Sequence, residues 1–193
     1  MIGLKQIKQS SFILGGAAFS GQGGGYGFGS VELKDVERVI HSARDRHVLA
    51  LDLAPIYGFT QAEKTVGLIT SKTREKYFLT SKSGVSWHSN GRVNLSNDPK
   101  LTQKMLEQSL RDLKTDYIDC YFIHWPDKRV DIRRPMELLQ KKKEQGLIRH
   151  IGLCNTNIDD FNLASSVGIV SIIQSEFNLF NKDLCNQLKK EII

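Results

Sequence analysis

Residues 117–124 (YIDCYFIH) form an apolar run of strand length that ends on a histidine. Five further apolar runs occur along the chain, and a helix-like stretch follows each of them. Strands that are apolar on both faces are typical of a parallel sheet covered by helices. The predicted strands are residues 12–14, 48–51, 77–80, 117–123, 148–153 and 169–173.

Helix signals occupy the segments between these strands. Ser30 is predicted to cap a helix whose apolar residues recur at steps of three and four between Leu33 and Ala43. Asp98 and Pro99 supply the cap and the first-turn proline of another helix. The remaining helices are predicted at residues 61–69, 136–145, 161–166 and from 183 onward. Residues 1–193 are therefore predicted to form a single α/β domain, either an open doubly wound sheet or a βα barrel.

The overall composition excludes several classes of protein. With 193 residues, 40% of them hydrophobic and 25% charged, the chain resembles an ordinary globular domain. No apolar run approaches the roughly 18 residues that cross a bilayer, so no membrane partner is expected. Much of the net charge of +6 lies in residues 128–149. That stretch contains no aromatic residue, so it is interpreted as a solvated helix face and not as a nucleic-acid site.

Cysteines and glycines give no sign of a metal or phosphate site. Cys120, Cys154 and Cys185 lie far apart and form no CxxC pair. They predict free thiols in a reducing compartment, hence a cytoplasmic protein without a metal centre. Residues 21–29 hold six glycines but match neither G-x-G-x-x-G nor G-x-x-x-x-G-K. This loop is expected to turn the chain and not to bind phosphate.

Polar side chains stand where the predicted strands end. In a βα barrel these ends surround one pocket, whereas in an open sheet they lie in a row. Each residue taken alone has an ordinary structural explanation, such as a turn or a helix cap, but their joint placement favours the barrel. The residues at the strand ends are Asp52, Lys82, His124, Asn155 and Gln174, with Tyr57 five residues after Asp52.

Four of these residues suit proton delivery to a carbonyl group. A tyrosine with its usual pKa of about 10 is a weak acid near neutrality. A neighbouring ammonium favours the phenolate, so Lys82 is expected to lower the pKa of Tyr57 and make it a general acid. Asp52 is expected to pair with Lys82. His124 is expected to hydrogen-bond the carbonyl oxygen and orient it.

Five segments in order resemble the aldo-keto reductase family. They cover most of the chain, and they are LDLAPIYG (51–58), FLTSKSG (78–84), DYIDCYFIHWPD (116–127), GLIRHIGLCNTN (146–157) and IIQSEFN (172–178). The resemblance implies a (β/α)8 barrel that uses NADPH, with NADH as the alternative, to reduce a small aldehyde or ketone, with sugars among the candidate substrates. It implies that Tyr57 donates the proton and that Trp125 lines the substrate pocket. It also implies that Asn155 and Gln174 hold the nicotinamide carboxamide.

Two departures from the family pattern shape the expectations. Cys154, counted here among the cofactor-binding residues, replaces the usual serine before Asn155 and is a weaker hydrogen-bond partner. A full barrel needs roughly 250 residues. The chain is therefore expected to be a C-terminally truncated member with six of the eight βα units. It would lack the family's phosphate-gripping segments and leave two sheet edges open to self-association. The alternative function is a catalytically impaired barrel remnant that senses nucleotide or binds a partner.

Overall fold

The computed structural model of the protein describes residues 12–21, 25–182, 184, 186 and 187. Its main sheet has six parallel strands in the order β1-β2-β3-β6-β7-β8. The strands are β1 (Leu14–Gly15), β2 (Ala50–Asp52), β3 (Phe78–Ser83), β6 (Ile118–Ile123), β7 (Ile148–Cys154) and β8 (Ile172–Gln174). The helices are α2 (Leu33–Asp45), α3 (Gln61–Thr70), α4 (Pro99–Asp112), α5 (Arg133–Glu144) and α6 (Ile158–Ser165), with 3-10 turns η1 (Gly16–Phe19) and η2 (Ser71–Lys76).

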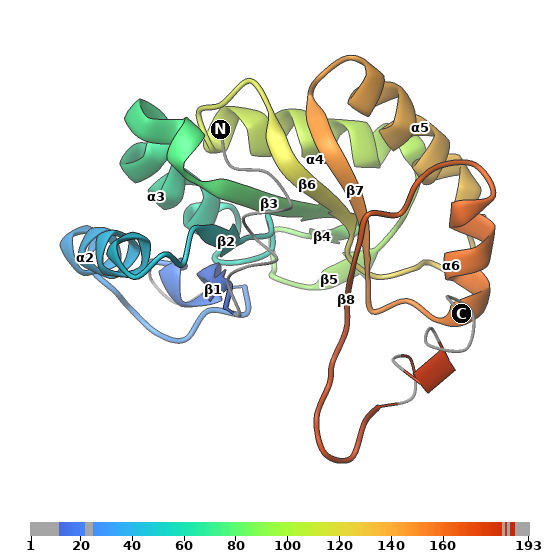
Figure 1. Cartoon of the computed structure of the whole chain (residues 1–193), viewed down its shortest axis with the longest axis horizontal. Coiled ribbons are helices and arrows are strands. Elements are labelled where there is room, and N and C mark those ends of the chain that lie inside the picture. Colours follow the sequence, from blue (N-terminus) through green and yellow to red (C-terminus); the bar gives the residue numbers. More distant parts are fainter. Residues whose placement is uncertain (1–11, 22–24, 183, 185, 188–193) are drawn as a thin grey trace.

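The sheet curls into the arc of a barrel. Strand β8 lies four positions from β2, which in a flat sheet is a separation of about 19 Å. Nevertheless, Gln174 Nε2 at the end of β8 donates a hydrogen bond to Asp52 Oδ2 at the end of β2, over 3.0 Å. Only a strongly curved sheet permits this contact, and Figure 1 shows the helices along the outside of the curve. The predicted incomplete (β/α)8 barrel is confirmed, and the open sheet is excluded.

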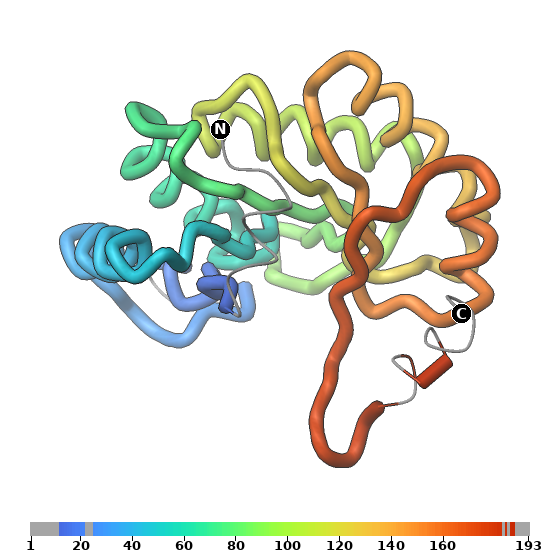
Figure 2. Tube along the Cα trace, viewed as in Figure 1, coloured from blue at the N-terminus to red at the C-terminus, as the bar shows by residue number. Residues whose placement is uncertain are grey.

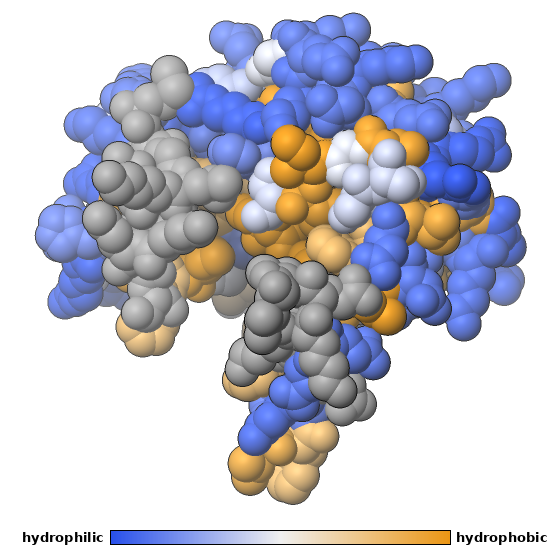
Figure 3. All heavy atoms as spheres, turned by 45° about the vertical axis from the view of Figure 1, so that its right-hand side comes forward, coloured by the Kyte–Doolittle hydropathy of each residue, from blue (hydrophilic) through white to orange (hydrophobic). Residues whose placement is uncertain are grey.

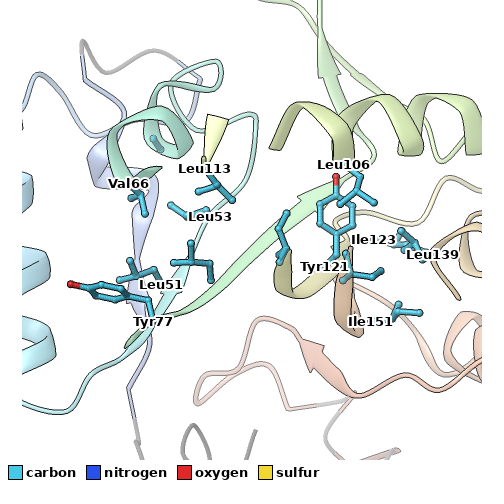
Figure 4. Packing of buried hydrophobic residues seen from close by; sticks show 14 of the residues in the cluster. Leu51, Leu53, Val66, Tyr77, Leu106, Leu113, Tyr121, Ile123, Leu139 and Ile151 are labelled. Atoms are coloured by element: carbon cyan, nitrogen blue, oxygen red, sulfur yellow. The ribbon is translucent and has the colours of Figure 1, made fainter. Parts of the chain in front are cut away.

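Each face of the arc has its own apolar core. The outer face packs against the helices in one large cluster, part of which is seen in Figure 4 between the strands and α3, α4 and α5. Leu51, Tyr121 and Ile151 belong to this outer layer. The inner face carries a smaller cluster built around Phe78 and Phe122. Because both faces are buried, the strands are apolar on both sides, as the sequence indicated.

The two predicted helix caps have different outcomes. The Asp98 side chain accepts hydrogen bonds from the backbone N–H groups of Lys100 and Leu101, and Pro99 opens the helix, so this prediction is confirmed. Ser30 was the wrong cap, because α2 begins after Glu32 and no side chain caps it. The stretch before α2 bonds back to the glycine loop instead, with Val31 N donating to the Gly21 carbonyl over 2.9 Å.

A β-hairpin that the sequence analysis missed interrupts the alternation of strands and helices. Strands β4 (Val85–Trp87) and β5 (Val93–Leu95) pair antiparallel directly after β3. Each has only three residues, and β5 is exposed throughout, so neither produces an apolar run. The Asn90-Gly91 pair between them is a turn signal that could have revealed the hairpin. It stands beyond the carboxyl end of β3, where the strand-end side chains gather.

The edge strands are shorter and more exposed than predicted. Within the described residues, β1 and β8 each pair on one side only. The expected buried strand at residues 12–14 is wrong, because Phe12 and Ile13 are exposed and β1 starts at Leu14. Ile169 is likewise exposed, and β8 starts three residues later. Self-association through these edges stays a prediction.

The segment after β8 projects from the body of the molecule (Figure 2). Phe177, Leu179 and Phe180 lie exposed on it, and Figure 3 shows hydrophobic residues at the tip of this projection. The helix predicted from Asp183, together with Cys185, falls largely outside the described residues. None of the helices in the described part of the chain has the length and apolarity that a membrane crossing needs.

Helices α3 and α4 approach each other at Gly67, where no side chain fits. A Cβ atom at this position would lie 2.2 Å from the Asp112 carbonyl oxygen. Because that atom is backbone, the helices must separate, so we expect Gly67→Ala to lower the free energy of unfolding by about 2 to 3 kcal/mol. Urea denaturation measures this change. Gly15→Ala is the control, since a Cβ atom there would have nothing within 4 Å. Equal losses in both variants would contradict the close approach.

Candidate active site

Asp52 and Lys82 form a buried ion pair at the carboxyl ends of β2 and β3. Lys82 is 1% exposed, and its Nζ lies 2.5 Å from Asp52 Oδ1 and 2.9 Å from the Leu53 carbonyl oxygen. The predicted pairing is therefore present. An ammonium without a partner would be costly at this depth, so Asp52 and the Leu53 carbonyl together hold the charge in place.

Asp52 is also the hub of a wider hydrogen-bond network. Thr80 Oγ1 donates to Oδ1 over 2.8 Å, and Gln174 Nε2 donates to Oδ2. Burial works against the charged carboxylate, but the charge of Lys82 and the hydrogen bonds from Lys82, Gln174 and Thr80 prevail and lower the pKa of Asp52 below its usual value. The carboxylate thus stays ionised and links β2 to the edge strand β8.

Tyr57 lies on the loop after β2, and its ring faces the ammonium. Lys82 Nζ is 5.4 Å from the centre of the Tyr57 ring. The loop turns sharply at Gly58, which has φ +63° and where a Cβ atom would meet the Ser20 backbone. Burial raises the pKa of Tyr57 and outweighs the charge of Lys82, which lowers it. The expected net lowering of this pKa is wrong, because the sequence did not reveal how far the hydroxyl is removed from water.

His124 stands opposite Tyr57 at the end of β6. Their ring centres are 6.3 Å apart, and the rings are perpendicular. Burial, aided by the positive charge of Lys82, lowers the pKa of His124 to about 3. The imidazole is therefore neutral at physiological pH and offers one N–H donor and one acceptor. Asn155 Nδ2 donates to the His124 carbonyl oxygen over 3.1 Å, which fixes the end of the strand.

Asn155, Cys154 and Gln174 lie at the neighbouring ends of β7 and β8. Asn155 has φ +52°, a left-handed conformation that asparagine tolerates. Its Nδ2 also contacts Cys154 Sγ over 3.2 Å, so the thiol orients the amide. Burial raises the pKa of Cys154 to about 11, which keeps this thiol neutral. Gln174 Oε1 is buried and has no hydrogen-bond partner among the described residues, so it can accept one from a ligand.

A cavity of about 720 Å³ opens over Tyr57 and His124. Trp125 lines it, and its contact with a substrate stays a prediction. The glycine-rich loop and the β4–β5 hairpin supply most of the remaining wall, and the sequence analysis assigned neither to the site. The residues around the cavity are Ala17, Tyr26, Gly27, Phe28, Tyr57, Val85, Val93, Leu95, His124 and Trp125. The described residues hold no cluster of metal-ligating side chains.

A second buried carboxyl group, Glu63, lies on the outer face of the sheet and was also missed. It is fully buried on α3, and its Oε1 accepts a hydrogen bond from Ser81 Oγ over 2.6 Å. Its Oε2 has no partner among the described residues. Burial is the main cause that raises the pKa of Glu63 to about 7, with nearby Asp112 acting in the same direction. Lys82 on β3 opposes this shift.

Glu63 should make stability depend on pH. The folded state holds this proton more tightly than the unfolded state, whose value is 4.5. Its contribution is therefore complete below pH 4.5 and is lost as the pH rises through about 7, by roughly 3 kcal/mol. We expect Glu63→Gln to match the original protein below this window and to be more stable above it. Denaturant titrations across the range measure this, with the exposed Glu137→Gln as control. Parallel curves for all three proteins would contradict the assignment.

Comparison with known proteins gives consistent matches. The model of the Aldo/keto reductase family matches residues 11–192. Aldo-keto reductase YhdN of Bacillus subtilis is 32% identical over 163 residues, which are 83% of this chain and 49% of that protein. The NADH-specific methylglyoxal reductase of Escherichia coli is 30% identical over 72% of this chain and 46% of its own length. The chain spans about half the length of these curated relatives.

Solved structures agree with the sequence matches. The glycerol dehydrogenase AKR11B4 of Gluconobacter oxydans superimposes with a TM-score of 0.83 at 31% identity. The match covers 92% of this chain and 56% of that one. The likeness therefore extends over nearly all of the curved sheet described above.

Proposed function

The chain belongs to the aldo/keto reductase family, and on that premise we propose that it reduces an aldehyde or ketone to an alcohol with a reduced nicotinamide nucleotide. One observation carries the proposal. The Tyr57 ring lies 5.4 Å from the buried Lys82 ammonium, on the floor of a cavity that it shares with neutral His124. A proton donor and a neutral hydrogen-bond donor thus face one cavity, and a fixed positive charge lies beside the ring of the proton donor.

Tyr57 is the proton donor in this proposal. Its pKa lies above the usual value, so the hydroxyl keeps its proton at physiological pH and has one to give. As the substrate carbonyl is reduced, negative charge grows on its oxygen, and the Tyr57 O–H donates to that oxygen. The resulting phenolate is stabilised by the ammonium of Lys82, which Asp52 holds in place. The fixed charge therefore acts mainly after the proton has moved.

His124 orients the substrate in the same scheme. Because its pKa is about 3, the imidazole does not compete with Tyr57 as an acid. Its neutral N–H can donate a hydrogen bond to the carbonyl oxygen. Together with the Tyr57 hydroxyl, this second donor would fix the direction in which the carbonyl points.

The residues at the ends of β7 and β8 fit a nicotinamide carboxamide. The unpartnered Gln174 Oε1 is an acceptor that an amide N–H would satisfy, and Asn155 presents a second amide close by. These two residues would hold the carboxamide, and Cys154 would orient Asn155. When bound, the reduced nucleotide supplies the hydride. We propose NADPH, and because the Escherichia coli relative is named NADH-specific, both nucleotides belong in the test.

The proposal is tested by mixing the purified chain with NADPH or NADH and a panel of aldehydes and ketones, while following the absorbance of the reduced nucleotide. Alcohol formation in step with nucleotide oxidation is the expected result. Nucleotide binding without turnover would contradict the reductase and favour a nucleotide-sensing protein. If the chain shows no nucleotide binding and no turnover, the result would favour an inactive remnant.

A further inference from the structure

The wall of the cavity over Tyr57 is almost entirely apolar. Among the described residues that line it there is no aspartate, glutamate, lysine or arginine. The lining side chains that can form hydrogen bonds are the Tyr57 hydroxyl, the His124 imidazole, the Tyr26 hydroxyl and the indole N–H of Trp125. Lys82, the nearest ammonium, is already occupied by Asp52 and the Leu53 carbonyl. The cavity therefore offers hydrogen-bond partners for one carbonyl oxygen and for few other polar groups of a ligand.

Large apolar side chains also gather at the mouth of this cavity. Four lining residues have large apolar side chains that are exposed to solvent, and they come from three separate segments of the chain. They are Tyr26, Phe28, Leu95 and Trp125. An exposed apolar group gathered around a concave site is typical of a binding surface. Their exposure is costly in water and is relieved when an apolar ligand covers them.

The β4–β5 hairpin is held as a fixed wall of the cavity. Arg129, in the segment after β6, donates from Nη2 to the Leu95 carbonyl oxygen and is paired with Asp127 over 2.8 Å. Asn97, which is buried just after β5, accepts from the Asp127 N–H over 2.6 Å. Trp125 lies two residues before Asp127 on the same segment. These contacts join the hairpin to the segment that carries Trp125. The hairpin wall and the Trp125 wall of the cavity are therefore held in a fixed relative position.

We infer that this cavity selects uncharged, apolar aldehydes and ketones, with an alkyl or aryl group, over hydroxylated or anionic ones, and that Leu95 on the hairpin is a specificity-determining residue. The inference rests on the proposed function and narrows its substrate class. A sugar or glycerol-type substrate would bring several hydroxyl groups, for which the side chains of these walls offer few partners beyond the Tyr26 hydroxyl and the Trp125 indole N–H, and an unpaired buried hydroxyl is costly. A carboxylate would find no free cation among the described residues of the wall. The sugar-type substrate considered from the sequence is thus disfavoured.

The first test compares kcat/KM for the straight-chain aldehydes hexanal and propanal with kcat/KM for glyceraldehyde and glyoxylate. Each methylene group buried against the wall should raise kcat/KM about fourfold, so hexanal should exceed propanal on the order of 50-fold. Glyceraldehyde and glyoxylate should fall below propanal. Equal or higher kcat/KM for glyceraldehyde would overturn the inference while leaving the reductase proposal intact.

A second variant tests the hairpin itself. Leu95 is partly exposed, so Leu95→Lys should fold normally while placing an ammonium at the cavity wall. We expect kcat/KM for hexanal to fall about tenfold and that for glyoxylate to rise. Leu163→Lys on α6, similarly exposed and outside the cavity, is the matched control and should leave both values unchanged. An unchanged ratio in Leu95→Lys would overturn the assignment of Leu95.

A binding measurement separates the failure of this inference from the failure of the proposed function. In a Trp87→Phe background, Trp125 is the remaining tryptophan, and its fluorescence reports on the cavity. Benzyl alcohol should change the emission at concentrations at least 100-fold below those of glycerol. If no carbonyl compound is reduced but benzyl alcohol still acts at concentrations at least 100-fold below those of glycerol, the cavity preference is supported and the reductase proposal is contradicted. If glycerol binds as well as benzyl alcohol, or neither binds, the inference is overturned.

Discussion

Tyr57→Phe should reduce kcat for carbonyl reduction by about 10³-fold, while leaving KM within a fewfold of the original. General acid catalysis of this kind contributes about 10²- to 10⁴-fold, and phenylalanine removes only the hydroxyl group that donates the proton. The ring itself packs against buried residues of both the outer cluster and a smaller one beside β4, and phenylalanine preserves those contacts. Steady-state kinetics with NADPH and an aldehyde that the unaltered protein reduces measure the effect.

Tyr117→Phe is the control for this change. Tyr117 lies outside the cavity, where the guanidinium groups of Arg74 and Arg149 stack on its ring. Losing its hydroxyl should leave kcat unchanged. If Tyr57→Phe retained full activity as well, another group would have to supply the proton and the assignment of Tyr57 would be wrong.

Lys82→Met should lower the free energy of unfolding by about 3 to 5 kcal/mol at neutral pH. Methionine fills a similar volume, but it leaves the Asp52 carboxylate buried without its cation, and an uncompensated buried charge is strongly destabilising. Burial is already the largest single influence on Asp52, and with the ammonium gone it is no longer outweighed and raises the pKa of this carboxyl. The deficit should therefore shrink as the pH falls and the carboxyl takes up a proton. Denaturant titrations at neutral and acidic pH measure both effects.

The paired variant Asp52→Asn with Lys82→Met separates charge from packing. It removes both charges together, so it should cost less stability than Lys82→Met alone. Its activity should remain low, because the proposed phenolate of Tyr57 has lost its stabilising ammonium. If the double variant were as unstable as Lys82→Met, the stability lost in Lys82→Met would not come from an uncompensated Asp52 carboxylate.

The positions of the site residues were predictable because strand ends are visible in a sequence. The apolar runs that end at Asp52, Lys82 and His124 are strands in the structure, and parallel strands present their carboxyl ends at the same edge of a sheet. The Asp98 cap was equally visible, because its hydrogen bonds are local. The capping by Ser30 failed because the chain before α2 bonds to the distant residue Gly21, which no local pattern encodes.

The sequence by itself determined the alternation of strands and helices, the order of the site residues and the likeness to the aldo/keto reductases, because these depend on local periodicity and short motifs. Only the tertiary structure decided that Asp52 and Gln174 meet although three strands separate them, that burial outweighs Lys82 at Tyr57, and that a short exposed hairpin walls the cavity. The reason is that curvature, desolvation and cavity lining depend on which distant residues exclude water together, and that is a property of the packed chain.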